Sequence, residues 1–382
     1  MDFNFTEEQI MMKDMAKKFA ETEMWPVVGD YDDKHIWPED IYKKLNETGL
    51  DCIGVPEEYG GAGIDFLGQA LVTEELARGD LGLATAVVAS TLLATDPIHI
   101  AANDDQKRRW FTKMLEGGKL AAFCLTEPGA GSDVGGMSTS CKKVDGGYIL
   151  NGTKCFITNG GVANQYTVFA TLDKKMGIKG ICCFMVDRES EGISVGKTEN
   201  KLGIRLSNTS EVVFDNVFVP EENRLGAEGT GWMTCMKTLD YSRPMIAALA
   251  VGTAQGAYDH AVEYAKMRVQ FGKPISSFQA VQFMLADACM EIEAGRLLYQ
   301  KACWLKMNGL PFSQASSISK GYCGDMAMRV TTDMVQVFGG YGYTKDYPVE
   351  KYMRDAKILQ IYEGTSQVQR MVVAANLLKG LR

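Results

Sequence analysis

The sequence predicts an α+β protein in which an N-terminal α-helical domain, a middle antiparallel β domain and a C-terminal α-helical bundle follow one another. Three observations support this order. Apolar residues recur at helical spacing over the first third, short β-rich runs fill the middle, and the helical period then returns. Strands and helices do not alternate, which disfavours a doubly wound dinucleotide-binding fold. We place the domains at residues 1–119, 120–232 and 233–382.

The N-terminal domain begins with a helix start signal. Thr6 precedes Glu7 and Glu8, as is typical of an N-cap followed by acids in the first turn. Turns rich in Gly and Pro, such as VPEEYGGAGI, separate the apolar periodic stretches that follow. These stretches predict helices over 8–22, 39–49, 67–79, 81–101 and 104–116.

After Lys119 the pattern changes to short β-rich runs joined by turns that carry Gly, Asn and Asp. The predicted strands are YILNG, KCFITNG, YTVFATL, GICCFMV and EVVFDNVFVP. From Thr234 the helical period returns to the end of the chain. It predicts helices near 234–271, 278–307, 313–339 and 348–378.

Composition and charge exclude several classes of protein. Hydrophobic residues make up 46% of the 382 residues and charged residues 23%, which is the balance of a globular protein and not of a disordered one. The net charge of -8 and the absence of a basic tract argue against a nucleic-acid binder. No apolar run reaches the roughly 20 residues of a membrane span, so we expect none.

Cysteine and histidine usage predicts neither disulfides nor a metal site. The ten cysteines are scattered without a C-x-x-C pair, and there are three isolated histidines. The N-terminal segment has acids from residue 2 onward and lacks the pattern of a signal peptide. We therefore expect a cytoplasmic protein with reduced thiols.

Four stretches carry residue types that bind ligands, and each also has an ordinary structural interpretation. Residues 123–133 free backbone N–H groups for a phosphate or flavin edge, or form a plain glycine-rich turn. Residues 154–161 offer an aromatic ring and a hydroxyl to a flat ligand, or form a half-buried strand. Residues 267–274 carry cations suited to a pyrophosphate or to the end of a helix. Residues 336–343 allow close approach of backbone to a ligand or subunit, or form a C-cap loop.

Several blocks along the chain together resemble the acyl-CoA dehydrogenases, flavoenzymes that desaturate an acyl-CoA thioester. In order they are PEEYGGAG, FCLTEPGAGSD, NGTKCFITNGG, LDYSRP, MRVQFGKPISSFQ, QVFGGYGYTKDYPVEKYMRDAKI and YEGTSQVQR. The LDYSRP block and the segment FMLADACMEIEAGRLLYQKACW resemble the medium- and short-chain branch. The resemblance covers nearly the whole chain and implies the same three-domain fold, with FAD as cofactor.

The resemblance also implies which residues hold the cofactor. Those expected around the flavin ring are Phe123, Leu125, Thr126, Gly131, Ser132, Phe156, Ile157 and Thr158. The expected adenine and pyrophosphate contacts are Arg268, Phe271 and Gln279, completed by Gln336, Gly339 and Gly340 of a second subunit. Thr365 and Gln367 complete the cofactor set.

Glu363 would be the catalytic base by the same resemblance, although an acid before a glycine would otherwise fit a helix-end surface position. It would remove the proton α to the thioester carbonyl while hydride leaves the β-carbon for flavin N5. The backbone N–H of the base and a flavin ribityl hydroxyl would stabilise the developing enolate. A desolvated pocket would raise the pKa of this base. The residues expected to contact the substrate are Ser132, Asp240, Arg243, Tyr362 and Gly364.

The substrate preference depends on residues 81–100, which line the far end of the acyl pocket in relatives. This segment has no Arg between Gly82 and Pro97, which disfavours a glutaryl-type substrate. Asp96 departs from the family pattern. It fits a helix cap or surface acid, or else a second proton acceptor in the pocket. The second interpretation predicts a cyclohexane- or cyclohexene-carboxyl-CoA substrate as an alternative to short- or medium-chain thioesters.

The resemblance further implies electron-transferring flavoprotein as redox partner and a homotetramer built as a dimer of dimers. The same fold would also serve an enoyl-CoA reductase, because the reaction is reversible. Two readings from other classes remain: a catalytically silent binding protein, and a nicotinamide oxidoreductase. Retention of Glu363 and the failed G-x-G-x-x-G spacing disfavour them respectively.

Overall fold

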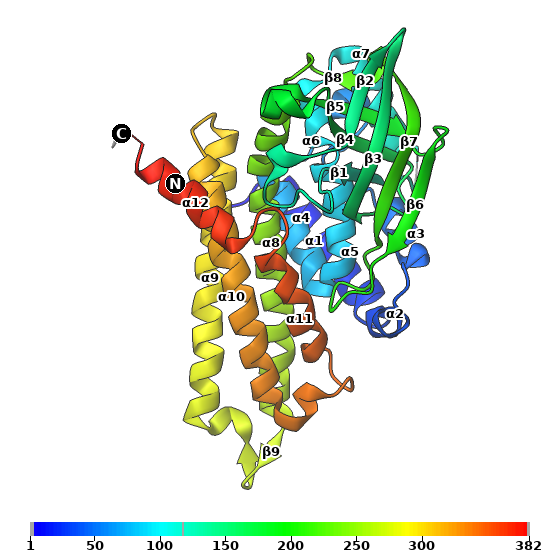
Figure 1. The fold of residues 1–382 in the computed structure, drawn as a ribbon. Coiled ribbons are helices and arrows are strands. Elements are labelled where there is room, and N and C mark those ends of the chain that lie inside the picture. The colour runs from blue at the N-terminus through cyan, green and yellow to red at the C-terminus, as the bar shows by residue number, and fades with distance from the viewer. Residues whose placement is uncertain (1–3, 117, 380–382) are drawn as a thin grey trace.

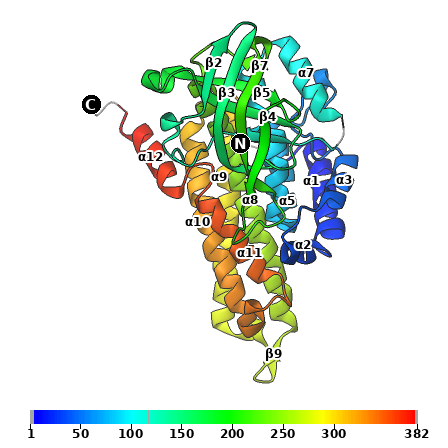
Figure 2. The same cartoon turned by 45° about the vertical axis from the view of Figure 1, so that its right-hand side comes forward.

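In the computed structural model, which describes residues 4–116 and 118–379, helices flank a twisted sheet and continue into a long bundle (Figures 1 and 2). Residues 1–3, 117 and 380–382, at the ends of the predicted outer domains, lie outside the described residues. The sheet and the N-terminal helices lie at one end of the molecule. The bundle of α8, α9 and α10 extends away from them towards the β9 hairpin (Figure 1). The predicted succession of helical, β and helical parts is confirmed.

The N-terminal part is helical, as predicted. Its helices are α1 (Glu7–Phe19), α2 (Val28–Lys34), α3 (Glu39–Glu47), α4 (Phe66–Gly79), α5 (Leu81–Val88), α6 (Asp96–Ala101) and α7 (Asp104–Leu115). Thr6 caps α1 in a capping box, because its hydroxyl accepts the Gln9 N–H at 3.2 Å and Gln9 Oε1 accepts the Thr6 N–H at 3.0 Å. Helix α2 was not predicted.

One expectation about apolar runs is wrong. Residues Leu81–Ala101 form a helical stretch of 21 residues with a mean hydropathy of 1.5, long and apolar enough to cross a membrane. Residues 81–98 of the stretch are buried inside the protein, where α5, a π-helical turn (Ala89–Leu93) and α6 follow one another. It is therefore a core segment.

All ten cysteines are free thiols, and only Cys289 is exposed among them.

The middle sheet is mixed, whereas an antiparallel sheet was predicted. Its strands are β1 (Ala121–Cys124), β2 (Ser140–Val144), β3 (Gly147–Thr158), β4 (Gln165–Thr171), β5 (Ile181–Asp187), β6 (Ile193–Thr198), β7 (Thr209–Pro220) and β8 (Arg224–Leu225). The order is β6-β7-β3-β2-β4-β5-β8, and β1 pairs with β4. The β1–β4 and β2–β4 pairings are parallel and the others antiparallel. Two predicted runs, YILNG and KCFITNG, form the single strand β3.

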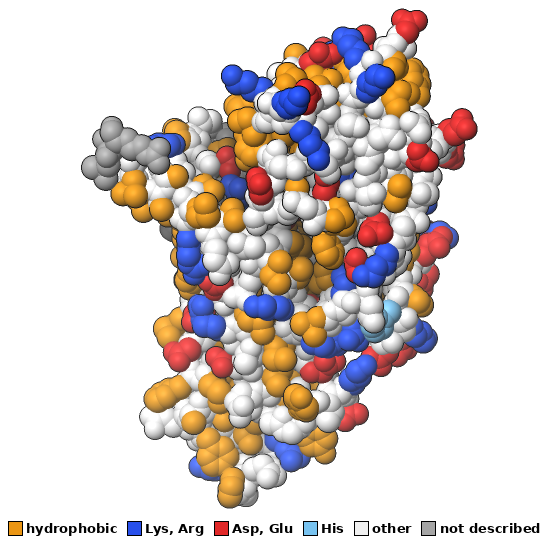
Figure 3. Space-filling model, viewed as in Figure 1, with side chains coloured by type: hydrophobic (Ala, Val, Ile, Leu, Met, Phe, Trp, Pro, Cys, Tyr) orange, Lys and Arg blue, Asp and Glu red, His pale blue; other side chains and the backbone are white. Residues whose placement is uncertain are grey.

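The C-terminal part consists of α8 (Gly231–Met267), α9 (Gln279–Met307), α10 (Ser313–Phe338), α11 (Val349–Ala356) and α12 (Ser366–Leu377). The helix predicted over 234–271 ends at Met267, and β9 (Val269–Gln270) pairs with β10 (Lys273–Pro274) beyond it. Hydrophobic side chains are exposed towards this end of the bundle (Figure 3). The single helix predicted over 348–378 is wrong, because the chain leaves the helical path between α11 and α12.

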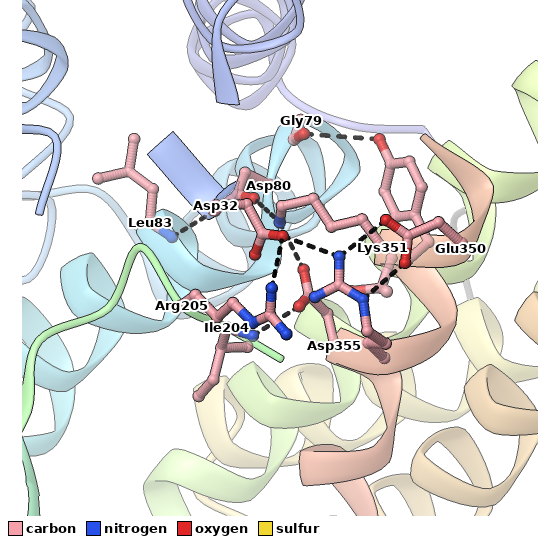
Figure 4. A network of polar contacts seen from close by, with 12 residues as sticks. Asp32, Gly79, Asp80, Leu83, Ile204, Arg205, Glu350, Lys351 and Asp355 are labelled. Carbon is pink, nitrogen blue, oxygen red and sulfur yellow. Dashed lines mark hydrogen bonds and ion pairs between the residues drawn. The ribbon is translucent and has the colours of Figure 1, made fainter. Parts of the chain in front are cut away.

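A buried ammonium group connects all three parts (Figure 4). Lys351 on α11 contacts the carboxylate of Asp80 and lies 2.6 Å from Asp355 Oδ2. Asp80 caps α5 by accepting the N–H of Leu83 at 2.7 Å, and Asp355 Oδ1 accepts the N–H of Ile204 from the segment between β6 and β7 at 2.5 Å. Burial opposes the charge of Lys351, but the carboxylates of Asp355 and Asp80 outweigh it and raise its pKa.

A second ion pair strengthens the same contact (Figure 4). Arg354 NH2 lies 2.8 Å from Asp32 Oδ2, which joins α11 to α2. Arg205, from the segment between β6 and β7, approaches the same carboxylate at 3.6 Å. The three acids and three cations of these contacts therefore fix the segment ahead of α12 against the N-terminal helices and the sheet.

We predict that Lys351→Met lowers the free energy of unfolding by about 3–5 kcal/mol, because it leaves two buried carboxylates without their cation. Urea unfolding followed by circular dichroism measures the change. The control is Lys43→Met, which removes only the exposed pair with Glu39 at 2.8 Å. Equal stability of the two variants would contradict a structural role for the Lys351 contact.

Candidate active site

Glu363 lies in the loop between α11 and α12, and its backbone is left-handed. Its φ is 54° and that of Gly364 is 86°. A left-handed conformation costs a non-glycine residue about 1–2 kcal/mol, so the surroundings must hold it. Gly364 accepts its own φ without this cost. The loop therefore depends on contacts from neighbouring helices.

Two side chains hold the carbonyl groups of the loop. Lys320 Nζ on α10 donates to Gly364 O at 2.6 Å. Gln369 Nε2 on α12 donates to Glu363 O at 3.2 Å and to Gly364 O at 2.9 Å. The backbone N–H of Glu363 has no hydrogen-bond partner in the part of the chain that the structure describes. This donor is available to a ligand.

Asp325 on α10 holds both ends of the same loop. Its Oδ1 accepts from Gln360 Nε2 at 2.8 Å and from Ser366 Oγ at 2.9 Å. Arg370 NH2 lies 2.7 Å from its other oxygen. These bonds join the residues just before and just after the left-handed turn, so one carboxylate sets the span of the loop.

The carboxylate of Glu363 has one hydrogen-bond donor among the residues that the structure describes. Ser242 Oγ on α8 donates to Oε2 at 2.9 Å. Burial raises the pKa of Glu363, while the Ser242 hydrogen bond and the charges of Lys320 and Arg243 oppose that rise. The net direction is upward, so this carboxylate binds a proton more readily than an ordinary glutamate does.

Asp240 and Arg243, both expected to contact the substrate, form an ion pair on α8. Arg243 NH1 lies 2.5 Å from Asp240 Oδ1 and 3.3 Å from Ser317 Oγ. The Arg243 side chain is buried, whereas the Asp240 side chain is 27% exposed. Asp240 is thus the more accessible of the two.

Asp96 is neither a helix cap nor a surface acid. It is the first residue of α6, has 8% of its surface exposed, and makes no hydrogen bond or ion pair with any residue that the structure describes. Burial, opposed by the charge of Lys306 and aided by that of Glu363, raises its pKa to about 7. Lys306 lies over two rings, with Nζ 3.4 Å from the centroid of Phe66 and 4.1 Å from that of Tyr241.

The loop after β1 is shaped by a buried ion pair that sequence reasoning missed. Lys154 Nζ on β3 lies 2.8 Å from Glu127 Oε1 and donates to Leu125 O at 3.0 Å. Burial opposes ionisation of Glu127, but Lys154 and donors at Ser138 and Thr139 lower its pKa to about 2. Glu127 and Lys154 both lie inside sequence blocks quoted above. Their opposite charges were the sequence feature that could have predicted this ion pair.

The end of β3, which carries residues expected around the flavin, and the Glu363 loop both contact α5. Tyr362 OH lies 3.4 Å from Thr85 Oγ1. The next residue of α5, Ala86, accepts a hydrogen bond at 2.8 Å from Asn159 Nδ2, just beyond the end of β3. Phe156, Ile157 and Thr158 directly precede Asn159. Consecutive residues of one helix therefore bring Glu363 and the end of β3 together.

A second group of expected residues lies at the other end of α8. Arg268, Gly339 and Gly340 line a hollow of about 490 Å³, and Phe271 nearby is 92% exposed. The sequence assigned Arg268 and the two glycines to different subunits, but a single chain brings them together. Ser242 and Arg268 are about 39 Å apart along the helix at 1.5 Å per residue.

Comparison with known families identifies the chain. Family models for the N-terminal, middle and C-terminal domains of acyl-CoA dehydrogenase match residues 6–118, 122–217 and 229–378. The chain belongs to the acyl-CoA dehydrogenase family. Enzymes of this family depend on FAD, so the chain is an FAD-dependent oxidoreductase.

Individual relatives support the assignment to the acyl-CoA dehydrogenase family. A short-chain specific acyl-CoA dehydrogenase of Megasphaera elsdenii is 46% identical, with 99% of this chain and 100% of that protein covered. The acryloyl-CoA reductase (NADH) of Anaerotignum propionicum is 40% identical, with 99% and 96% covered. A solved structure of butyryl-CoA dehydrogenase from Megasphaera elsdenii has a TM-score of 0.97 at 46% identity, with 99% and 100% covered. A chain from a structure on the electron transferring flavoprotein of Acidaminococcus fermentans has a TM-score of 0.97 at 47% identity and the same coverage.

The residues present fit FAD in two places. A Cβ added at Gly129 or Gly131 would have nothing within 4 Å, so the backbone there is open to a ligand. Phe156 has a φ of 55° and is 64% exposed at the end of β3. The hollow lined by Arg268 offers a guanidinium and two open glycine backbones to a phosphate.

We predict that Gly364→Ala lowers acyl-CoA turnover by about 100-fold, the scale of a small misplacement of a reacting group. The new Cβ would lie 2.7 Å from Gln369 Nε2, which bonds to the Glu363 carbonyl. Gly177→Ala is the control, because Gly177 has a φ of 56° but nothing within 4 Å of an added Cβ. Equal turnover losses in the two variants, at equal FAD content, would contradict the role of the Gln369 contact.

Proposed function

We propose that this acyl-CoA dehydrogenase desaturates its thioester with Glu363 as the catalytic base. The observation that carries the proposal is the environment of Glu363. Its desolvated carboxylate accepts a hydrogen bond from one hydroxyl among the described residues, and side chains of α10 and α12 hold its left-handed loop. A carboxylate in this environment is a stronger base than one in water.

The Glu363 carboxylate takes the proton from the α-carbon of the acyl group. The electron pair of that C–H bond forms the new α,β double bond as hydride leaves the β-carbon. FAD, when bound, supplies the acceptor for that hydride. The free backbone N–H of Glu363 donates to the thioester oxygen and stabilises the enolate character that develops there. Tyr362 and the α5 helix exclude water from one side of the carboxylate.

One chain does not complete the cofactor site that we propose. The residues around β3 lie near Glu363, and those around Arg268 lie at the far end of α8. A single FAD contacts both sets only if a second copy of the chain supplies one of them. We therefore infer at least a dimer, and a dimer of dimers is the assembly that the resemblance implies. The similar structures support electron transferring flavoprotein as the redox partner.

We predict that Glu363→Gln lowers the rate of substrate-dependent flavin bleaching by 100-fold or more, within the range of about 10²–10⁴ for loss of a general base. Anaerobic single-turnover absorbance measures this rate. FAD content and acyl-CoA affinity should stay near those of the unaltered protein, because the amide keeps the size of the side chain. Undiminished bleaching would rule out Glu363 as the base.

The substrate that we propose is a short-chain or alicyclic acyl-CoA, with cyclohexane- or cyclohexene-carboxyl-CoA as the alicyclic form. Asp96 supports the alicyclic alternative, since it is buried, free of hydrogen bonds within the described chain, and close enough to Glu363 for their charges to interact. A pKa near 7 suits a group that accepts a proton at neutral pH. With a ring substrate Asp96 would take the single proton of the turnover from a ring carbon, in place of the α-proton that Glu363 takes from a linear thioester, and one hydride would still leave for FAD.

We predict that Asp96→Asn lowers turnover of cyclohexene-carboxyl-CoA by about 100-fold and changes butyryl-CoA turnover less than twofold, because only the ring needs the second acceptor. Steady-state rates with both thioesters measure this difference. Asp105→Asn, an exposed acid on α7, is the control. Unchanged turnover of every cyclic and linear thioester would remove Asp96 from the mechanism.

A second candidate is an enoyl-CoA reductase, and the acryloyl-CoA reductase of Anaerotignum propionicum favours it. The two directions share the Glu363 site, with the carboxylic acid then giving its proton to the α-carbon. Reoxidation of the reduced flavoprotein by an enoyl-CoA, compared with its reoxidation by electron transferring flavoprotein, decides the direction.

A further inference from the structure

Ion pairs neutralise some of the charged side chains around the Glu363 loop. Arg243 is paired with Asp240 at 2.5 Å. Asp325 is paired with Arg370 at 2.7 Å. Lys320 and Glu363, like Asp96, have no ion-pair partner within 4.0 Å among the described residues.

Lys320 is costly to bury in this position. Its side chain is completely buried on α10, and the one hydrogen bond that it makes within the described residues goes to the carbonyl of Gly364, next to Glu363. An ammonium ion with three donors and one acceptor loses most of its hydration without replacement. Burial accordingly lowers its pKa to about 8, and the charge of Glu363 is the strongest influence that opposes this fall.

We propose that Lys320 is a positioning residue for the catalytic base: it holds the left-handed loop through Gly364 O and keeps the Glu363 carboxylate ionised. The inference rests on the proposed role of Glu363 and deepens it. Lys320 does not touch the substrate, and its charge acts through the loop and across the short space to the carboxylate.

The expected effect on pH dependence has a definite sign. A cation near Glu363 favours the charged carboxylate and so lowers its pKa. Without that cation the pKa rises, and the acid limb of kcat/KM, which reports the free enzyme, moves to higher pH. Arg243 and Cys235 on α8, Asp325 on α10, Asp96 on α6 and Tyr362 on the loop also face this region, and none of them changes in the test.

Two substitutions separate the charge of Lys320 from its hydrogen bond. Lys320→Gln keeps a donor for Gly364 O but loses the charge, and Lys320→Met loses both. Lys201→Met is the matched control. Lys201 is a partly buried lysine that, like Lys320, has a pKa lowered to about 8 by burial and donates to a backbone carbonyl, that of Ser207 at 2.8 Å; it lies in the segment between β6 and β7.

The experiment measures kcat/KM of the FAD-loaded protein for butyryl-CoA from pH 5 to 9. We expect the acid limb to move up by roughly one pH unit in both Lys320 variants, and to stay in place in Lys201→Met. A limb that moves only in Lys320→Met would assign the effect to the hydrogen bond and overturn the proposal. An unmoved limb in both Lys320 variants would also overturn it, whatever their loss of rate or stability.

Failure of the proposal is distinguishable from failure of the proposed function. If Glu363 is the base and Lys320 does not act on it, Glu363→Gln is inactive while the Lys320 variants keep the acid limb of the unaltered protein. If Glu363 is not the base, Glu363→Gln retains turnover. The thermal midpoint of each variant, measured with FAD bound, identifies any variant that fails to fold, and Lys320→Gln then carries the test because it preserves the polar contact.

Discussion

The buried ammonium of Lys351 determines where the two walls of the site lie. Through Asp80 it fixes the first turn of α5, whose Thr85 contacts Tyr362. Through Asp355 it fixes the end of α11, from which the chain reaches Glu363 within eight residues. One charge therefore positions both Glu363 and the helix that Tyr362 contacts. An ion pair of this kind adds little net stability compared with apolar packing, but it defines the relative position of the segments that it joins.

The carboxylates of the site fall into two groups according to their distance from a cation. Glu127 is in direct contact with Lys154, and its pKa falls to about 2 in spite of burial. Asp96 has Lys306 only as a more distant charge, and burial raises its pKa to about 7. The pKa of Glu363, which has no cation within 4.0 Å among the described residues, is raised by burial as well. A carboxylate in direct contact with a cation, such as Glu127, stays ionised near neutral pH and has a structural role. A carboxylate whose cation is more distant keeps a raised pKa and accepts a proton more readily.

The helices and the main strands followed from hydrophobic periodicity, because long elements with one buried face leave a clear pattern. Short elements such as β1 and β8 leave almost none. The break at residues 361–365 was missed because apolar residues continue at helical spacing on both sides of it, and only Gly364 interrupts them. The residues expected around the flavin and the expected base came from the quoted sequence blocks. Lys320 and Lys306 lie outside those blocks, and Lys154 lies inside one without being singled out, since a lone lysine in a helix or strand normally marks a solvated face. Only the tertiary contacts show that these three lysines are covered.

The left-handed conformation of Glu363 explains why the helix must break there. In a continuous helix the backbone N–H of this residue would be bonded to a carbonyl four residues earlier and would not be available to a ligand. The turn at Glu363 and Gly364 frees that donor, while Lys320 and Gln369 occupy the carbonyls and so prevent the loop from returning to the helical path. The same residue thus presents a carboxylate through its side chain and a hydrogen-bond donor through its backbone. For the proposed reaction, a site fixed in advance in this way needs no rearrangement as charge develops on the thioester oxygen, and this lowers the barrier to proton removal.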